Sequence, residues 1–142
     1  MPDRDYSHRD VVDKLGIKPG HAVAVADESG GRLGVAADLL ARVRAKVGRE
    51  LAREDEPLDV ALLSVDERSN WVEVLARWKA RMEPTGGVWL LTPKRGLPGY
   101  VDQNRLIEAG QQAGLVDNKV CSVSEHLSAM RFVLRKADRP RR

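Results

Sequence analysis

Two adjacent cations, Lys94 and Arg95, are the residues of this sequence best suited to bind a charged ligand. They follow the apolar run Val88–Thr92 and lie in the segment Pro93–Gly99, whose prolines and glycines restrict the backbone. An apolar run without alternation predicts a strand buried on both faces, as in a parallel sheet flanked by helices. Open α/β sheets bind ligands at the edge where such strands end. We therefore expect Lys94 and Arg95 either to hold an anionic group at that edge or to be solvated loop charges.

A second polar group follows an earlier apolar run, His21–Asp27. In the segment Asp27-Glu28-Ser29-Gly30-Gly31 an acid ends the run, and two glycines precede a helical pattern. A methyltransferase needs a glycine-rich loop after its first strand, where the cofactor approaches bare backbone, and an acid after its second strand, which holds the ribose hydroxyl groups. Ser29 stands where a glycine would help most, so the loop is incomplete, and a simple turn explains the glycines better. The candidate ligand-binding residues are Asp27, Ser29, Gly30, Gly31, Ser64, Lys94 and Arg95.

Several other chemistries have no signature in this sequence. A Gly-x-x-x-x-Gly-Lys-Ser/Thr phosphate loop, a Gly-x-Ser-x-Gly elbow and a Tyr-x-x-x-Lys pair are absent. His8, His21 and His126 have no His or Cys partner at short spacing, so we expect no metal site. Cys121 lies in an apolar run without an identifiable base and is expected to be a small buried residue. We assign no catalytic residue and leave the cofactor open.

Apolar runs predict five strands. We expect His21–Asp27, Leu58–Val65 and Val88–Thr92 to be adjacent and parallel, with Leu58–Val65 central. Two final strands are expected at Val120–Val123 and Arg131–Leu134. The segment that joins them contains too little Gly, Asn or Asp for a tight hairpin.

Helical spacing and capping residues predict four helices between these strands. A capping box of Ser7 and Asp10 is expected to open a short helix. A long helix with an apolar stripe is expected from Leu33 to Leu51. Asn70 and Asp102 are expected to cap two more helices.

The composition fits one globular domain. The chain has 142 residues, of which 42% are hydrophobic and 32% charged. We expect a cytoplasmic protein without a membrane partner. The chain has one cysteine, no apolar run of membrane-helix length and no signal-like start. We expect the domain at residues 7–136, between an N-terminal tail, 1–6, and a basic tail, 137–142.

Positive charge is concentrated at the C-terminus. Residues 131–142 hold six Lys or Arg against one Asp, which gives +5, so the remainder of this +3 chain carries −2. Such a tail could contact nucleic-acid phosphates or an acidic partner. Because only 4% of residues are aromatic, we expect no base-stacking surface.

Two motifs are similar to those of the C-terminal two thirds of class I S-adenosylmethionine methyltransferases. Met82–Val88 resembles the Leu-x-Pro-Gly-Gly-x-apolar sequence before the central strand, and Ala113-Gly114-Leu115 resembles the end of the helix before the last two strands. More specifically, residues 7–138 resemble an uncharacterised bacterial Rossmann-like family of unknown function. The segments that carry this second resemblance are Leu15–Gly20, Val88–Lys94, Gly114–Cys121 and Met130–Val133.

The resemblance implies a single three-layer Rossmann-like α/β domain with a mostly parallel sheet and a C-terminal antiparallel strand pair. Three functions follow as hypotheses. The first is a non-catalytic binding or regulatory protein with a small anionic or nucleotide-like ligand, or a protein partner, at the sheet edge. The second is an S-adenosylmethionine-dependent methyltransferase with a degenerate cofactor loop. The third is nucleic-acid or acidic-partner binding through the basic tail.

Overall fold

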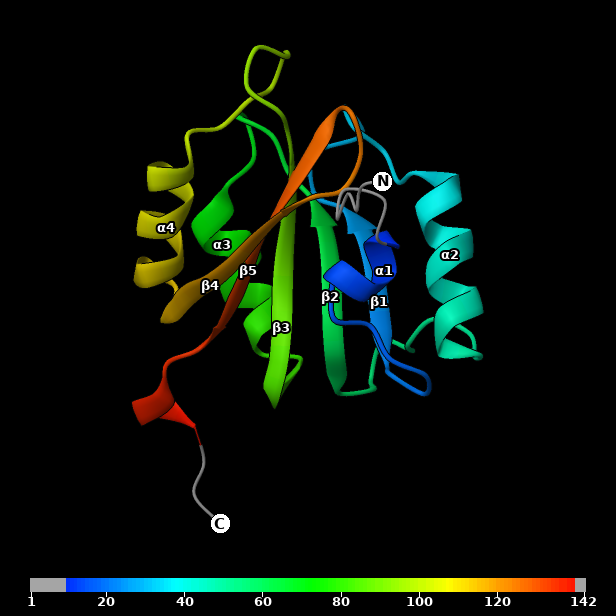
Figure 1. Ribbon diagram of the computed structural model, residues 1–142. Coiled ribbons are helices and arrows are strands. Elements are labelled where there is room, and N and C mark those ends of the chain that lie inside the picture. Colours follow the sequence, from blue (N-terminus) through cyan, green and yellow to red (C-terminus); the bar gives the residue numbers. More distant parts are fainter. Residues whose placement is uncertain (1–9, 140–142) are drawn as a thin grey trace, which may run out of the picture.

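A five-stranded mixed sheet forms the centre of the molecule in the computed structural model, which describes residues 10–139 (Figure 1). Strands β1 (Val23–Asp27), β2 (Leu58–Ser64) and β3 (Met82–Pro93) are parallel, with β2 between the other two. Strands β4 (Leu115–Ser122) and β5 (Leu127–Leu134) form an antiparallel pair joined to β3 through β5. The order β1-β2-β3-β5-β4 confirms the expected parallel core with an antiparallel C-terminal pair.

Helices cover both faces of the sheet. Helices α1 (Val11–Lys14) and α2 (Ala37–Val47) pack on one face, and α3 (Trp71–Lys79) and α4 (Gln103–Gln112) pack on the other. This confirms the expected three-layer α/β architecture. Since successive strand residues point to opposite faces, Ser64 shares the α2 face with Leu62.

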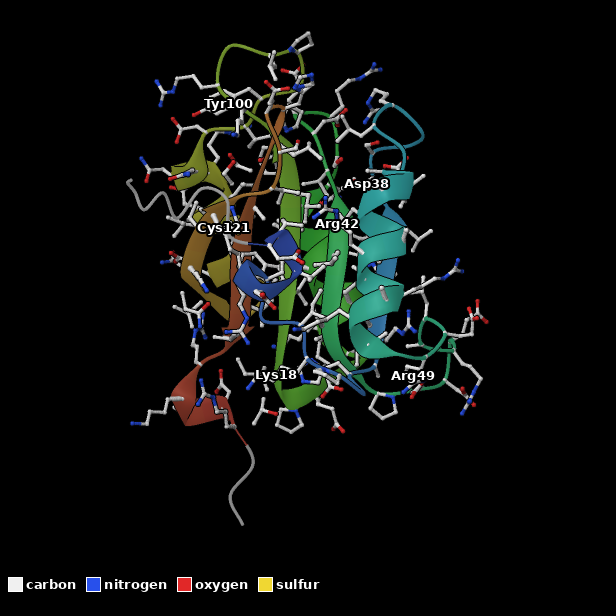
Figure 2. The ribbon with its side chains drawn as sticks, turned by 45° about the vertical axis from the view of Figure 1, so that its right-hand side comes forward. Lys18, Asp38, Arg42, Arg49, Tyr100 and Cys121 are labelled. Atoms are coloured by element: carbon white, nitrogen blue, oxygen red, sulfur yellow. The ribbon has the colours of Figure 1, made fainter. Side chains whose placement is uncertain are left out.

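Strands β1, β2 and β3 end together, at Asp27, Ser64 and Pro93, and we call this end of the sheet the carboxyl edge. Figure 2 shows Tyr100 and Asp38 toward this end of the molecule and Lys18 and Arg49 toward the other. The candidate residues of the sequence analysis therefore all lie at the carboxyl edge or in the loops that follow it.

The long helix begins later and ends earlier than predicted. Helix α2 starts at Ala37, and residues 28–36 form a loop. The side chains of Asp27 and Ser29 accept hydrogen bonds from the amides of residues 29, 31, 33 and 34, so these amides are held in a loop rather than a helix. At the other end Gly48, with a φ of 70°, terminates the helix before Leu51.

The short first helix is capped by Asp10 itself, whose side chain accepts a hydrogen bond from the amide of Val12. The predicted capping role of Ser7 lies outside the described residues. So do the predicted tail at residues 1–6 and residues 140–142 of the predicted basic tail.

The prediction about the last two strands was wrong in two respects. Strand β4 begins at Leu115, and its pairing with β5 shifts between Asp117 and Lys119, so Asn118 forms a bulge within the strand. The strands are joined by a four-residue connection, residues 123–126. Ser124 supplies the turn chemistry, because its hydroxyl oxygen accepts hydrogen bonds from the amides of His126 and Leu127.

The segment Met82–Val88 belongs to strand β3 rather than to a turn. Its glycines serve close packing: a Cβ on Gly86 would lie 2.8 Å from the carbonyl oxygen of Leu58, and one on Gly87 would collide with Arg131. None of the helices in residues 10–139 is long and apolar enough to cross a membrane.

Candidate functional site

The loop after β1 is closed on itself by hydrogen bonds. The carboxylate of Asp27 accepts hydrogen bonds from the amides of Ser29 at 2.8 Å, Gly31 at 3.0 Å and Gly34 at 3.1 Å, and from the hydroxyl of Ser29. The Ser29 side chain is fully buried, and its oxygen also accepts from the Leu33 amide at 2.9 Å. With four donors around it, the Asp27 carboxylate has little capacity left for a ribose hydroxyl.

The charge of Asp27 is stabilised by this loop. Burial alone would raise the pKa of Asp27, but the hydrogen bonds from Ser29 and from the loop amides outweigh burial and lower it. Gly30 and Gly31 have φ angles of 72° and 91°. This left-handed conformation turns the loop so that the Gly31 amide reaches the carboxylate. The two glycines thus serve the turn that the sequence analysis weighed against a cofactor loop.

Asp66, just after β2, is a second centre that the sequence analysis did not identify. It is 3% exposed and forms a two-point ion pair with Arg32, at 2.6 Å from Nε and 2.8 Å from Nη2. The Arg32 guanidinium, together with the Arg68 amide and the Ser69 hydroxyl, lowers the pKa of Asp66 to about 2. Arg32 and Asp66 lie 34 positions apart, so no local spacing could have paired them.

Glu28 forms a third closed group, with α3. Its carboxylate accepts two hydrogen bonds from the Arg77 guanidinium, at 2.8 and 3.0 Å, and one from the indole N–H of Trp78 at 2.8 Å. The bonds from Arg77 and Trp78 lower the pKa of Glu28. Every carboxylate of these three groups is already paired within the chain.

Open space remains on the α2 face. A cavity of about 280 Å³, which we call the inner hollow, lies between the loop before α2 and the β4–β5 connection. In Figure 1 that connection and the beginning of α2 lie at the same end of the molecule. The lining is mostly apolar and consists of Val25, Leu33, Gly34, Val35, Ala36, Leu39, Leu62, Ser64, Leu91, His126 and Leu127.

A larger cavity of about 470 Å³, the outer hollow, adjoins the inner one and shares Ala36, Leu39 and Leu127 with it. Its charged lining residues are Asp10, Lys14, Asp38 and Arg42. Arg42 lies 3.7 Å from Asp10 and 3.2 Å from Asp38, and Figure 2 shows Asp38 and Arg42 together on α2. The two hollows are therefore neighbours, and Asp10, Val11 and Lys14 in the lining place the outer one beside α1.

The structure brings some of the candidate residues together and separates others. Asp27 and Ser64 are register partners on β1 and β2, and the Glu28 amide donates to the Ser64 carbonyl oxygen at 2.8 Å. Ser64 also lines the inner hollow. Asp27, Ser29, Gly30 and Gly31 form the closed loop beside that hollow without lining it.

Lys94 and Arg95 lie apart from this group. The ammonium group of Lys94 donates to the Ser122 hydroxyl at 2.7 Å, and Arg95 lies over the Tyr100 ring at 5.5 Å. Arg95 and Tyr100 line a polar cavity of about 320 Å³ at the start of α4, together with Asp102. The cations therefore belong to the α4 side of the carboxyl edge, while Ser64 belongs to the α2 side.

Metal-binding and thiol chemistry have little support in the geometry. Within residues 10–139, no group of three or more His, Cys, Asp or Glu side chains is arranged to hold a metal ion. Cys121 is a free thiol, only partly buried, and burial raises its pKa.

Comparison with known proteins supports the fold that this geometry shows. A solved S-adenosylmethionine-dependent methyltransferase from Aquifex aeolicus aligns with a TM-score of 0.55 and 15% identity, over 87% of this chain and 88% of that one. The O-methyltransferase NcsB1 from neocarzinostatin biosynthesis, solved with S-adenosyl-L-homocysteine, aligns with a TM-score of 0.62 and 13% identity, over 89% of this chain and 54% of that one. At these identities the likeness shows a Rossmann-like methyltransferase fold.

The sequence also has relatives among curated bacterial proteins. The uncharacterized protein Rv2239c of Mycobacterium tuberculosis is 33% identical over 103 residues, which cover 70% of this chain and 65% of that protein. This chain thus spans less than two thirds of the length of the curated relatives it matches. The family model for proteins of unknown function DUF3052 matches residues 12–136. The chain therefore belongs to the DUF3052 family of proteins of unknown function.

Proposed function

We propose that this protein is a non-catalytic binding domain that takes a small ligand in the inner hollow at the carboxyl edge of its sheet. The proposal rests on one observation: the carboxylates around that edge are already hydrogen-bonded to other groups of the chain. Asp27, Glu28 and Asp66 are each held by donors of the chain itself, while the adjoining hollow is open. A binding domain needs such a space and no catalytic group.

The closed loop after β1 argues against S-adenosylmethionine as the ligand. That cofactor needs exposed backbone at a glycine-rich loop and a free acid for its ribose. Here the Ser29 side chain is buried inside the loop, and the loop amides are bonded to Asp27. The acid after β2, Asp66, is paired with Arg32. The residues present therefore do not fit this cofactor, and we derive no reaction through it.

A methyltransferase is the second candidate, because the fold aligns with structures such as NcsB1, whose complex contains S-adenosyl-L-homocysteine. Against this candidate, the chain has little room for the second and third strands of that fold, since α2 and the loops on either side of it fill the interval between β1 and β2. We place the binding domain in the cytoplasm, where its single thiol would stay reduced.

Calorimetric titration with S-adenosylmethionine separates the two candidates. We expect a dissociation constant weaker than about 1 mM, which corresponds to less than about 4 kcal/mol of binding free energy. A dissociation constant in the low micromolar range would overturn the proposal and establish a cofactor site.

Native mass spectrometry of gently purified protein tests the position of the site. Val25 lines the inner hollow, whereas Val120 is 45% exposed on the edge strand β4. We expect a bound small molecule on the wild type and on Val120→Trp, but not on Val25→Trp. Equal retention by Val25→Trp would place the ligand elsewhere.

A further inference from the structure

We propose that the inner hollow selects an uncharged, largely apolar molecule with one hydrogen-bonding oxygen, of the size and chemistry of a substituted phenol. This inference rests on the proposed function, since it names the ligand class of the same site. Three features support it: the mostly apolar walls of the hollow, one hydroxyl in its lining, and the balance of charge in the adjoining outer hollow.

The walls of the hollow are mostly hydrocarbon, and Ser64 and His126 are the two polar side chains in its lining. Strands β1, β2 and β3 contribute Val25, Leu62 and Leu91, and the covering segments contribute Leu33, Val35, Leu39 and Leu127. Such walls reward the transfer of apolar surface from water and offer no compensation to a buried charge. The volume of about 280 Å³ is roughly twice that of an apolar cavity known to hold benzene, at about 150 Å³. One aromatic ring with substituents therefore fits.

Ser64 supplies the polar contact. It is 8% exposed and lines the hollow, and its hydroxyl forms no hydrogen bond to any other side chain or backbone group in residues 10–139. At the same edge, the buried side chains of Ser29 and Asp66 are both hydrogen-bonded. Among the described residues Ser64 is not one of the polar side chains shut off from solvent without a partner, so its hydroxyl faces the open hollow. A ligand oxygen placed there could take the place of water, whereas a hydrogen atom would leave the hydroxyl without a bond.

The four charged residues that line the adjoining outer hollow, two acids and two cations, balance one another. Arg42 is paired with both Asp10 and Asp38. Lys14 forms no ion pair within the described part of the chain, and its charge brings the sum of the four residues to zero. The nearest carboxylate of the adjoining loop, Asp27, is occupied by its own donors. A strongly anionic or zwitterionic ligand therefore gains little electrostatic attraction here.

Fluorine NMR titrations with three matched probes test the inference directly. The probes are 4-fluorophenol, fluorobenzene and 4-fluorobenzoate, which share one ring and differ in a hydroxyl group and a charge. We expect 4-fluorophenol to bind most tightly, fluorobenzene more weakly and 4-fluorobenzoate most weakly. Ser64→Ala should weaken 4-fluorophenol binding by about 3–10-fold, the worth of one hydrogen bond, and leave fluorobenzene unchanged.

Two further variants serve as controls. Ser122→Ala removes a hydroxyl on β4 that does not line the hollow, and it should bind all three probes as the wild type does. Val25→Trp should lose both neutral probes. The inference is overturned if none of the probes binds, if 4-fluorobenzoate binds most tightly, or if Ser64→Ala keeps the full preference for the phenol. None of these results touches the proposed function, which fails separately if S-adenosylmethionine binds.

Discussion

The two faces of the sheet end differently at the carboxyl edge. On the α3 side the polar groups are joined into closed pairs: the indole N–H groups of Trp71 and Trp78 donate to the Asp66 carbonyl and the Glu28 carboxylate, each at 2.8 Å. On the α2 side the loop after β1 bonds to itself, and the Ser64 hydroxyl is left facing a hollow.

This difference is the basis of the proposed function, in which a methyltransferase-like fold carries a binding hollow and no cofactor loop. When a loop satisfies its own amides with its own carboxylate, it needs no ligand to be stable. A hollow remains between this loop and the β4–β5 connection. If the two faces differ in this way, substitutions on them should have unequal effects on stability.

The largest effect is expected at Trp78, on the closed face. This side chain is 7% exposed, packs in the core under α3 and bonds to Glu28. Trp78→Ala should lower the free energy of unfolding by about 3–5 kcal/mol, because it opens a large cavity. Denaturant titration measures this, and a loss under about 1 kcal/mol would show that the face is loosely packed.

The Asp66–Arg32 pair comes next. The pKa of Asp66 is about 2 in the folded protein, below its ordinary value of 3.8. Its charge therefore stabilises the fold above pH 3.8, and this stabilisation is lost as the pH falls toward 2. Asp66→Asn should cost about 2–3 kcal/mol at neutral pH and remove this part of the acid sensitivity.

The control for that experiment is Asp55→Asn, at a carboxylate whose side chain is 85% exposed. It should leave both the stability and its pH dependence nearly unchanged. An acid-unfolding profile of Asp66→Asn that matches the wild type would mean that the pair is not formed.

A smaller loss is expected on the open face. Leu39 is 6% exposed and lines both hollows, whereas Leu90 is fully buried on the α3 face. Leu39→Ala should cost about 2 kcal/mol and Leu90→Ala about 4 kcal/mol, because a side chain already next to empty space loses fewer contacts. Equal losses in denaturant titrations would contradict the difference between the faces.

The smallest effect on stability is expected at Lys94 and Arg95. Their charges contribute little to folding, so Lys94→Ala/Arg95→Ala should change the free energy of unfolding by less than about 0.5 kcal/mol. We expect the same variant to lose whatever affinity the loop has for inorganic phosphate, followed by NMR shifts. If phosphate causes the same NMR shifts in the variant as in the wild type, these two residues do not bind it.

Much of the fold could be predicted from the sequence. The continuous apolar runs at His21–Asp27 and Leu58–Val65 predicted parallel strands, because only a sheet covered on both faces buries such runs. Asn70 and Asp102 predicted helix starts, and their side chains accept hydrogen bonds from the amides of Glu73 and Asn104. These signals are local, so one sequence suffices to recognise them.

The site could be predicted only in part. The strand order led us to expect a site at the carboxyl edge, and Ser64, which lines the proposed binding hollow, was among the candidate residues. The start of α2 was wrong because Leu33 and Ala36 have helical spacing, while the competing hydrogen bonds from Asp27 and Ser29 depend on loop geometry. The Arg32–Asp66 pair joins distant positions, and the hollow depends on how three segments pack, so neither has a local signal.

The bulge at Asn118 has a consequence for self-association. Strand β4 is the outer strand on its side of the sheet, and it exposes Val116 and Val120. Without the bulge these valines, four positions apart, would lie on one face. With it, Val116 pairs with Val133 and Val120 with Met130, on opposite faces. The unpaired edge therefore presents no continuous apolar strip to a strand of another molecule, which protects the protein against aggregation through its longest open edge.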